Sequence, residues 1–350
     1  MPVTVIVGGQ FGGEGKGKVA HYLAREMGAK VAVRVGGSNS GHTVIDPAGK
    51  ALILRQLPTP SILPDITCVL CAGSYIDVDI LFDEIASTGL STDRLYVDPN
   101  AVVVTEDEIN VEKISCLRSS IGSTQSGTGA AVIRRVSRDG AARLAKDDER
   151  LKQFVRPVVP YMRELLSKGE RIIIEGTQGF GLSLLHSPYY PYVTSRDTSA
   201  AAFVSEAGLS PVDVDDIVLV IRTYPIRVGG NSGPLYDEID WNTITIASGS
   251  NTKIEERTSV TNTIRRVAKF DPTIVLEAIS TNSPTRIVLN HMDYIPYLVK
   301  EKTSLKKAAQ FMKNVESMLG QAIDMVGFGP DSLKNSRDHL GLTLKLTTKN

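Results

Sequence analysis

Apolar, β-branched segments recur along the chain, with amphipathic stretches between them. Most are continuous rather than alternating, which is typical of strands covered on both faces of a parallel sheet. They lie at residues 3–9, 30–37, 66–73, 171–179, 216–230 and 285–293. Helical spacing of apolar residues occurs at 17–28, 155–169 and 304–320. The alternation predicts an α/β fold with a mostly parallel central sheet and helices on both faces. Ligands are then expected beyond the carboxyl ends of the strands.

Three segments rich in glycine, serine and threonine interrupt this pattern, at residues 121–129, 228–234 and 247–263. Such segments pack poorly and wrap ligands well, so we interpret them as long ligand-binding loops rather than linkers. We find no internal repeat and no block of like charge. We therefore expect a single domain over residues 1–350.

Basic and acidic residues are equal in number, 39 of each, so the formal net charge is zero. This balance favours neither nucleic acid nor a membrane surface as a partner. No apolar run approaches the ~20 residues that span a bilayer, and no leader precedes the first strand, so we expect a cytoplasmic protein. Cys68 and Cys71 have CxxC spacing but lie within the apolar run 66–73, which favours buried thiols over a redox or zinc pair.

The first predicted strand leads into the sequence GGQFGGEGKGK at residues 8–18. It differs from a P-loop in having Gly17, not serine or threonine, after Lys16. Its chemistry is still that of phosphate binding, because glycines expose backbone N–H groups, Lys16 adds positive charge and a helix N-terminus follows. A glycine-rich turn without a ligand is the alternative.

A second glycine turn, VGGSNSGHTVI at residues 35–45, places His42 close to Asn39 and Gly41. Histidine is the side chain best suited to donate a proton near neutral pH. We interpret His42 as functional because it lies in a glycine-rich turn after a predicted parallel strand.

The motifs EGKGK, NSGHT, EGTQGFGLSL, YPYVTS and RVGG together resemble the adenylosuccinate synthetase family, up to the GFGPDS segment at 327–332. The resemblance implies a P-loop-NTPase-like fold and a ligase. In such a ligase a nucleoside triphosphate phosphorylates O6 of a purine monophosphate, and the amine of L-aspartate then attacks C6 and expels phosphate. It also implies Mg²⁺, ATP, dATP or GTP as co-substrate, and a homodimer.

Matching positions carry the family's site residues onto this chain. The implied catalytic residues are Lys16, His42 and Gln178. The implied purine-monophosphate residues are Gly13, Asn39, Thr124, Arg138, Gln178, Thr194, Arg227, Val228 and Thr263, with Arg138 reaching across the dimer interface. The implied triphosphate residues are Gly12, Gly15, Lys16, Gly17, Gly41, His42, Thr43, Arg265, Asn290, His291, Asp293, Gly327 and Gly329. The implied L-aspartate residues are Ser259, Val260, Thr261, Asn262 and Arg265. The backbone carbonyls of Gly13 and Gly41 are the implied Mg²⁺ ligands.

Three positions depart from the family pattern. Gly13 replaces an aspartate that binds Mg²⁺ and removes the N1 proton of inosinate. Thr263 replaces an arginine that meets the ribose 2′-hydroxyl and aspartate. His291 replaces a lysine that lies two positions before Asp293, and in the family the aspartate reads the guanine of GTP. ATP, dATP and GTP therefore all remain possible co-substrates.

Together these departures favour deoxyguanylate (dGMP) as the substrate, because glycine leaves space near N1 for a C2 substituent and the lost arginine relaxes the ribose requirement. This resembles the bacteriophage branch of the family, whose product, N6-succino-2-amino-2′-deoxyadenylate, leads to 2-aminoadenine in DNA. A viral enzyme of this kind would act in the host cytoplasm. One argument opposes dGMP, since a carboxylate pairs well with guanine's N1–H and 2-amino donors.

An IMP-using adenylosuccinate synthetase and a non-catalytic nucleotide-binding paralogue remain as alternatives. A plain P-loop NTPase fits least, because it has no need of the loop at residues 121–129.

Overall fold

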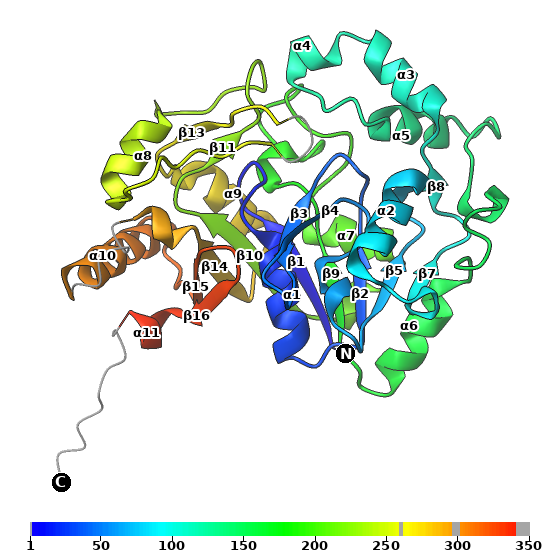
Figure 1. Cartoon of the computed structure of the whole chain (residues 1–350), viewed down its shortest axis with the longest axis horizontal. Coiled ribbons are helices and arrows are strands. Elements are labelled where there is room, and N and C mark those ends of the chain that lie inside the picture. The colour runs from blue at the N-terminus through cyan, green and yellow to red at the C-terminus, as the bar shows by residue number, and fades with distance from the viewer. Residues whose placement is uncertain (1, 259–261, 296–301, 341–350) are drawn as a thin grey trace.

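The computed structural model describes residues 2–258, 262–295 and 302–340 (Figure 1). Its centre is a nine-stranded sheet with the order β16-β15-β14-β10-β1-β9-β2-β5-β7. Neighbouring strands are parallel except β15 and β16. The strands are β1 (Val3–Gly8), β2 (Val31–Arg34), β5 (Thr67–Leu70), β7 (Leu95–Val97), β9 (Ile172–Glu175), β10 (Val214–Arg222), β14 (Arg286–Asn290), β15 (Met325–Phe328) and β16 (Ser332–Asn335). The predicted mostly parallel α/β sheet is confirmed.

Helices cover both faces of the sheet, as the packing of β1 demonstrates. Its valines Val3, Val5 and Val7 belong to the same core cluster as α6 (Val158–Ser167), α7 (Ala200–Ala207), α9 (Pro272–Asn282) and α10 (Lys302–Leu319). Ile6 belongs to the cluster formed with α1 (Lys16–Glu26). Successive side chains of a strand point to opposite faces, so these clusters lie on opposite sides of the sheet. The other helices are α2 (Val78–Thr88), α3 (Glu106–Ile114), α4 (Leu117–Ile121), α5 (Thr128–Ser137), α8 (Trp241–Ser248) and α11 (Ser336–His339).

Short strands form three smaller sheets. They are β3 (His42–Ile45) with β4 (Ala51–Leu54), β6 (Tyr75–Ile76) with β8 (Val102–Val103), and β11 (Ile226–Arg227) with β13 (Arg266–Ala268) and β12 (Glu238–Ile239). The prediction of one strand over residues 216–230 is wrong, because β10 ends at Arg222 and β11 joins a different sheet. Pro225, which has no N–H to donate to a ladder, lies between the two strands.

Five neighbouring parallel strands, β14, β10, β1, β9 and β2, end at one edge of the sheet. Four of them end in a buried polar side chain, namely Asn290, Arg222, Glu175 and Arg34. Buried charges in proteins are usually paired or bound to a ligand. This edge is therefore where a functional site is expected.

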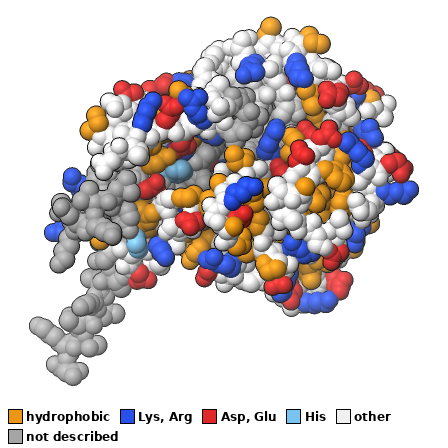
Figure 2. All heavy atoms as spheres, in the orientation of Figure 1, with side chains coloured by type: hydrophobic (Ala, Val, Ile, Leu, Met, Phe, Trp, Pro, Cys, Tyr) orange, Lys and Arg blue, Asp and Glu red, His pale blue; other side chains and the backbone are white. Residues whose placement is uncertain are grey.

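In the space-filling view, basic and acidic side chains are interspersed over the face shown (Figure 2). Within the described ranges, no helix is both long enough and apolar enough to cross a membrane.

Candidate active site

A cavity of about 650 Å³ lies over the carboxyl edge of the sheet. Its volume lies within the range that small-molecule ligands usually occupy. The predicted residues in its lining are Gly12, Gly13, Gly15, Lys16, Gly17, Asn39, Gly41, His42, Thr43, Thr124, Gln178, Val228, Asn262, Arg265, His291 and Gly329. Segments from across the whole sequence therefore converge on one cavity.

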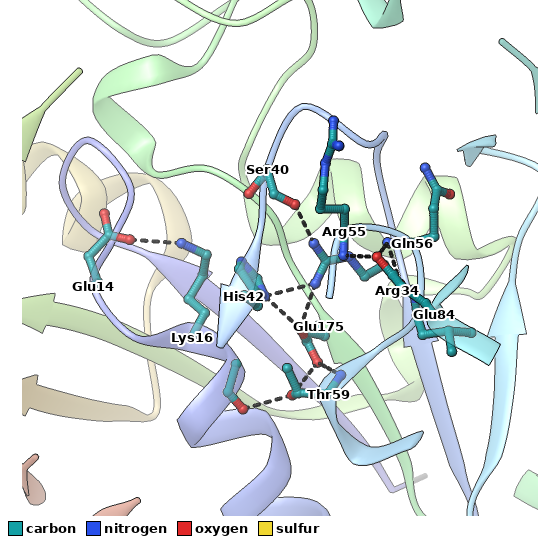
Figure 3. Close-up of polar contacts among 12 residues, drawn as sticks. Glu14, Lys16, Arg34, Ser40, His42, Arg55, Gln56, Thr59, Glu84 and Glu175 are labelled. Atoms are coloured by element: carbon teal, nitrogen blue, oxygen red, sulfur yellow. Dashed lines mark hydrogen bonds and ion pairs between the residues drawn. The ribbon is translucent and has the colours of Figure 1, made fainter. Parts of the chain in front are cut away.

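The first glycine turn leads from β1 into α1. Gly15, with φ of +88°, turns the chain into the helix, which begins at Lys16. Glu14 folds back over the turn, where one carboxylate oxygen accepts from the N–H of Gly12 at 2.7 Å and the other pairs with Lys16 Nζ at 2.7 Å (Figure 3). The ammonium of Lys16 and the helix N-terminus meet at the cavity, an arrangement that binds anions.

His42 is the first residue of β3, and its side chain is hydrogen-bonded to Glu175, the last residue of β9. The Nδ1 atom of His42 lies 2.5 Å from Glu175 Oε1, and Arg34 Nη1 donates to the same oxygen at 2.7 Å (Figure 3). The other Glu175 oxygen accepts from the N–H and the hydroxyl of Thr59 at 2.8 and 2.7 Å. Arg34 Nη1 also lies 2.9 Å from His42 Nδ1, but the closer carboxylate oxygen of Glu175 can only accept. We therefore assign the proton to Nδ1, which leaves Nε2 for the cavity side.

Burial and the neighbouring Arg34 charge set the ionisation of this group. Burial, and then Arg34, lower the pKa of His42 to about 4, against the opposing effect of Glu175. Burial raises the pKa of Glu175, but the His42 hydrogen bond and the charges of His42 and Arg34 outweigh this effect and bring the pKa to about 2. At neutral pH the site therefore combines a carboxylate, a guanidinium and a neutral imidazole.

The second glycine turn is held by two arginines. Arg34 Nη2 donates to the carbonyl of Ser40 at 2.8 Å (Figure 3). Arg55 Nε donates to the carbonyl of Ser38 at 2.6 Å. Glu84 in turn accepts from the N–H of Arg55 at 2.5 Å. These contacts place Ser40, and with it Gly41, at the wall of the cavity.

Gly13 is enclosed on the side where a side chain would project. A Cβ atom there would lie 2.6 Å from Ile226 Cδ1, 3.1 Å from Arg265 Nη1 and 3.3 Å from Arg222 Nη1, and φ is +70°. Glycine thus opens no space in this direction, in contrast to our expectation, because β10 and β11 fill it. Its carbonyl accepts from Arg222 Nη1 at 2.8 Å, an arrangement that opposes a metal ion at the same oxygen.

The loop at residues 259–265, which is predicted to bind L-aspartate, is described only in part. Ser259, Val260 and Thr261 lie outside the described residues. Thr263 is not in the cavity lining, and its N–H and hydroxyl lie 3.0 and 3.1 Å from the hydroxyl of Thr258 at the base of the loop. Arg265 does line the cavity. A short side chain at residue 263 thus stays within its own loop.

Residues 290–293, which the resemblance assigns to the base of the triphosphate, are hydrogen-bonded to the first glycine turn. Asn290 is fully buried and donates to the carbonyl of Glu14 at 2.7 Å, while His291 Nε2 lies 3.2 Å from the carbonyl oxygen of Gly13. Asp293 accepts from the N–H of Gly329 at 3.1 Å. Asn290, Asp293 and Gly327 are not in the cavity lining, whereas His291 and Gly329 are.

The remaining purine-side residues divide into two groups. Asn39 Nδ2 donates to Thr194 Oγ1 at 3.4 Å at the cavity rim, and Arg227 Nη2 donates to the carbonyl of Tyr192 at 2.8 Å beneath it. Arg138 is elsewhere, because it directly follows α5 as the C-cap residue and lines a separate hollow of about 430 Å³ with Arg134 and Arg135. Within one chain, Arg138 is therefore not brought to the main cavity.

Sequence reasoning missed the charged groups beneath the cavity. Arg34, Glu175 and Arg222 end their strands, and Glu256 lies in the cavity lining. The available signal was a charged residue at the end of a continuous apolar run, as in VAVR, IIIE and VLVIR. Lys18 was also missed; it lines the cavity and donates to the carbonyl of Gly329 at 2.9 Å.

The cysteines behave as predicted from their apolar context. Cys68 and Cys71 are both buried, and burial raises the pKa of each thiol to about 12. Over the described ranges, no group of three or more histidine, cysteine, aspartate or glutamate residues is placed to hold a metal ion.

Comparison with known proteins gives one consistent result. The sequence pattern of the family described as adenylosuccinate synthetase matches residues 5–146 and 141–303. Adenylosuccinate synthetases of Methanococcus aeolicus and Methanocaldococcus jannaschii are each 35% identical over 339 residues. These matches cover 95% of this chain in both cases, and 98% and 95% of the relatives.

Two solved structures resemble the fold. The succinoaminodeoxyadenylate synthetase of cyanophage S-2L, bound to dGMP and to dATP as an energy donor, is 31% identical with a TM-score of 0.82, over 96% of this chain and 95% of that one. The adenylosuccinate synthetase of Plasmodium falciparum, at 21% identity, has a TM-score of 0.81 over 95% and 98% of the two chains. The second likeness concerns the fold alone.

Proposed function

Because the chain belongs to the adenylosuccinate synthetase family, and is thus a carbon–nitrogen ligase joining aspartate to a purine nucleotide, we propose that its purine substrate is dGMP. The product is then N6-succino-2-amino-2′-deoxyadenylate, a precursor of 2-aminoadenine in DNA. The proposal aligns the chain with the bacteriophage branch of the family.

The observation that carries this proposal is the enclosure of Gly13. Ile226, Arg222 and Arg265 occupy the volume that a side chain at residue 13 needs, so the surroundings are built for a site without the family's aspartate. Thr263, in place of an arginine, removes a partner for a ribose 2′-hydroxyl. The likeness to a solved enzyme that was bound to dGMP and dATP is a separate support for the proposal.

The reaction proceeds in two steps. The γ-phosphoryl group of the triphosphate moves to O6 of the purine with loss of the nucleoside diphosphate, as the N1 proton is released to solvent. The aspartate amine then adds to C6, phosphate leaves, and the nitrogen gives up a proton to solvent. Lys16 and the turn amides neutralise charge on the phosphoryl group. His42 presents Nε2 to it, and the incoming negative charge favours protonation of the ring, which then acts as the acid toward O6 by donating a hydrogen bond.

Magnesium fits this site only in part. Mg²⁺ prefers oxygen ligands and often keeps waters and substrate phosphates in its shell. Of the two predicted carbonyls, Gly13 already accepts from Arg222, whereas Gly41 lies at the cavity wall. Gly41 is therefore the protein ligand that we propose. The ion would supply charge neutralisation between phosphate groups.

The first alternative is an IMP-using adenylosuccinate synthetase, which the archaeal relatives favour. The second is a non-catalytic paralogue, against which the His42–Glu175 pair argues, because nucleotide binding alone does not need an oriented imidazole. The choice of nucleoside triphosphate also helps to distinguish the dGMP proposal from these alternatives, since the similar phage enzyme was bound to dATP.

The experiment that separates them is phosphate release with Mg²⁺ and L-aspartate, using ATP, dATP or GTP with dGMP, GMP, IMP or dIMP. A preference for dGMP supports the proposal. A preference for IMP returns the chain to ordinary purine synthesis. No aspartate-dependent release with any of the four identifies the paralogue.

We also propose a homodimer in which Arg138 completes the neighbouring site. Exposed apolar side chains on α3 and α5, namely Ile114, Ile133 and Val136, are 84%, 66% and 64% exposed, and a second copy would cover them. If this is correct, mixing inactive Lys16→Met and Arg138→Ala proteins restores activity, because a mixed dimer has one intact site. A monomer by light scattering would contradict it.

A further inference from the structure

The carbonyl groups of Gly13 and Glu14, in the first glycine turn, are both contacted by side chains of residues 290 and 291. Asn290 Nδ2 donates to the carbonyl of Glu14 at 2.7 Å, and His291 Nε2 contacts that of Gly13 at 3.2 Å. A carbonyl only accepts, so the His291 ring must carry its proton on Nε2. The residue that the family resemblance assigns to the base of the triphosphate is thus directed at the glycine turn.

The same oxygen is also held from β10. Arg222 Nη1 donates to the Gly13 carbonyl at 2.8 Å, and the Arg222 side chain is fully buried. Arg222 pairs with Glu256, which accepts from the hydroxyl of Tyr294 at 2.8 Å. Burial and the Arg222 charge lower the pKa of His291 to about 3, so the ring is neutral and has a single donor.

Holding these oxygens orients the amides that follow them. In a planar trans peptide the C=O and the next N–H point in opposite directions. Fixing the carbonyls of Gly13 and Glu14 therefore aims the N–H groups of Glu14 and Gly15 away from residues 290 and 291. Across the described part of the chain, neither of these N–H groups donates a hydrogen bond, so both remain for a ligand.

We propose that His291 is a positioning residue that orients the glycine turn for the phosphate groups of the triphosphate, instead of reading its base. The inference rests on the triphosphate binding proposed above and deepens it. His291 acts through the Gly13 carbonyl and does not itself contact phosphate. Its loss should weaken every ligand that carries the phosphate chain by a similar factor, whatever base is attached.

The test compares His291→Leu with His291→Gln in the full chain. Leucine and glutamine have similar size and an unbranched Cβ, so both meet the φ of +61° at residue 291 in the same way. Only glutamine retains an N–H donor. Binding of inorganic tripolyphosphate, ATP and GTP is measured by calorimetry with Mg²⁺, beside the thermal midpoint of each variant.

We expect His291→Leu to bind all three ligands about 3- to 10-fold more weakly, as the loss of one hydrogen bond implies, and His291→Gln to stay within about 2-fold of wild type. A changed ATP-to-GTP ratio with unchanged tripolyphosphate binding would assign His291 to the base and overturn the inference. Equal weakening in both variants, or in neither, would also overturn it. If wild type itself binds no triphosphate, the proposed function fails first.

Discussion

Substitution of Gly13 by aspartate tests whether the surroundings of this residue are built for glycine. The new Cβ would stand 2.6 Å from Ile226 Cδ1, well inside contact distance, and its carboxylate would compete with Glu256 for Arg222. The φ of +70° adds strain, roughly 1–2 kcal/mol for an ordinary residue and less for aspartate. Overpacking adds about 1–3 kcal/mol.

A combined effect of about 1.5–4 kcal/mol on the turn corresponds to a loss of about 10- to 1,000-fold in kcat/KM. The assay is phosphate release with dGMP under fixed triphosphate and L-aspartate, together with the thermal midpoint. Gly13→Ala is the matched control, since it introduces the same contact without the charge. We expect it to lose activity by a similar factor.

The double variant Gly13→Asp with Ile226→Val makes the test specific. Valine lacks the Cδ1 atom that causes the overlap, and by itself this change costs about 0.5–1.5 kcal/mol. We expect it to recover part of the lost dGMP turnover. Full dGMP activity and an unchanged midpoint in Gly13→Asp alone would refute the packing argument.

The remaining predictions concern the groups around the cavity. Glu175→Gln should lower the free energy of unfolding by about 3–5 kcal/mol in a denaturant titration, because it leaves Arg34 buried without its counterion, and a change below about 1 kcal/mol would contradict this. Stability should decline as pH falls from 6.5 towards 4.5, with a net slope of about 1.4 kcal/mol per pH unit. The pKa values of His42 and His291 are about 4 and 3 when folded and 6.5 when unfolded, so only the unfolded chain gains protons there, whereas Glu206, whose pKa burial raises to about 7, gains one in the folded chain and offsets one histidine. A pH-independent midpoint in calorimetry over that range would count against it. Thr263→Arg should raise GMP turnover relative to dGMP about 10-fold, and an unchanged ratio would remove residue 263 from sugar selection.

Local patterns sufficed where the structure depends on neighbouring residues. The strand at residues 3–8, the glycine turn and the helix that starts at Lys16 follow from a continuous apolar run, glycines and a helical spacing in direct succession. The position of His42 in the cavity lining was predictable because glycine-rich turns after parallel strands lie at the carboxyl edge of the sheet. The end of β10 was not predictable, since the apolar pattern continues past Arg222 although the chain leaves the central sheet there.

The sequence by itself thus determined the α/β class, the glycine turn between β1 and α1 and most of the cavity's lining, because these are encoded by short-range pattern and by motifs. Only the tertiary structure decided which buried charges meet. Glu175 reaches His42, Arg222 reaches Gly13 and His291 reaches the same Gly13 oxygen across 133, 209 and 278 residues of sequence. Those pairings depend on the order of the strands in the sheet, a long-range property that brings their carboxyl ends to one edge and that no local pattern specifies.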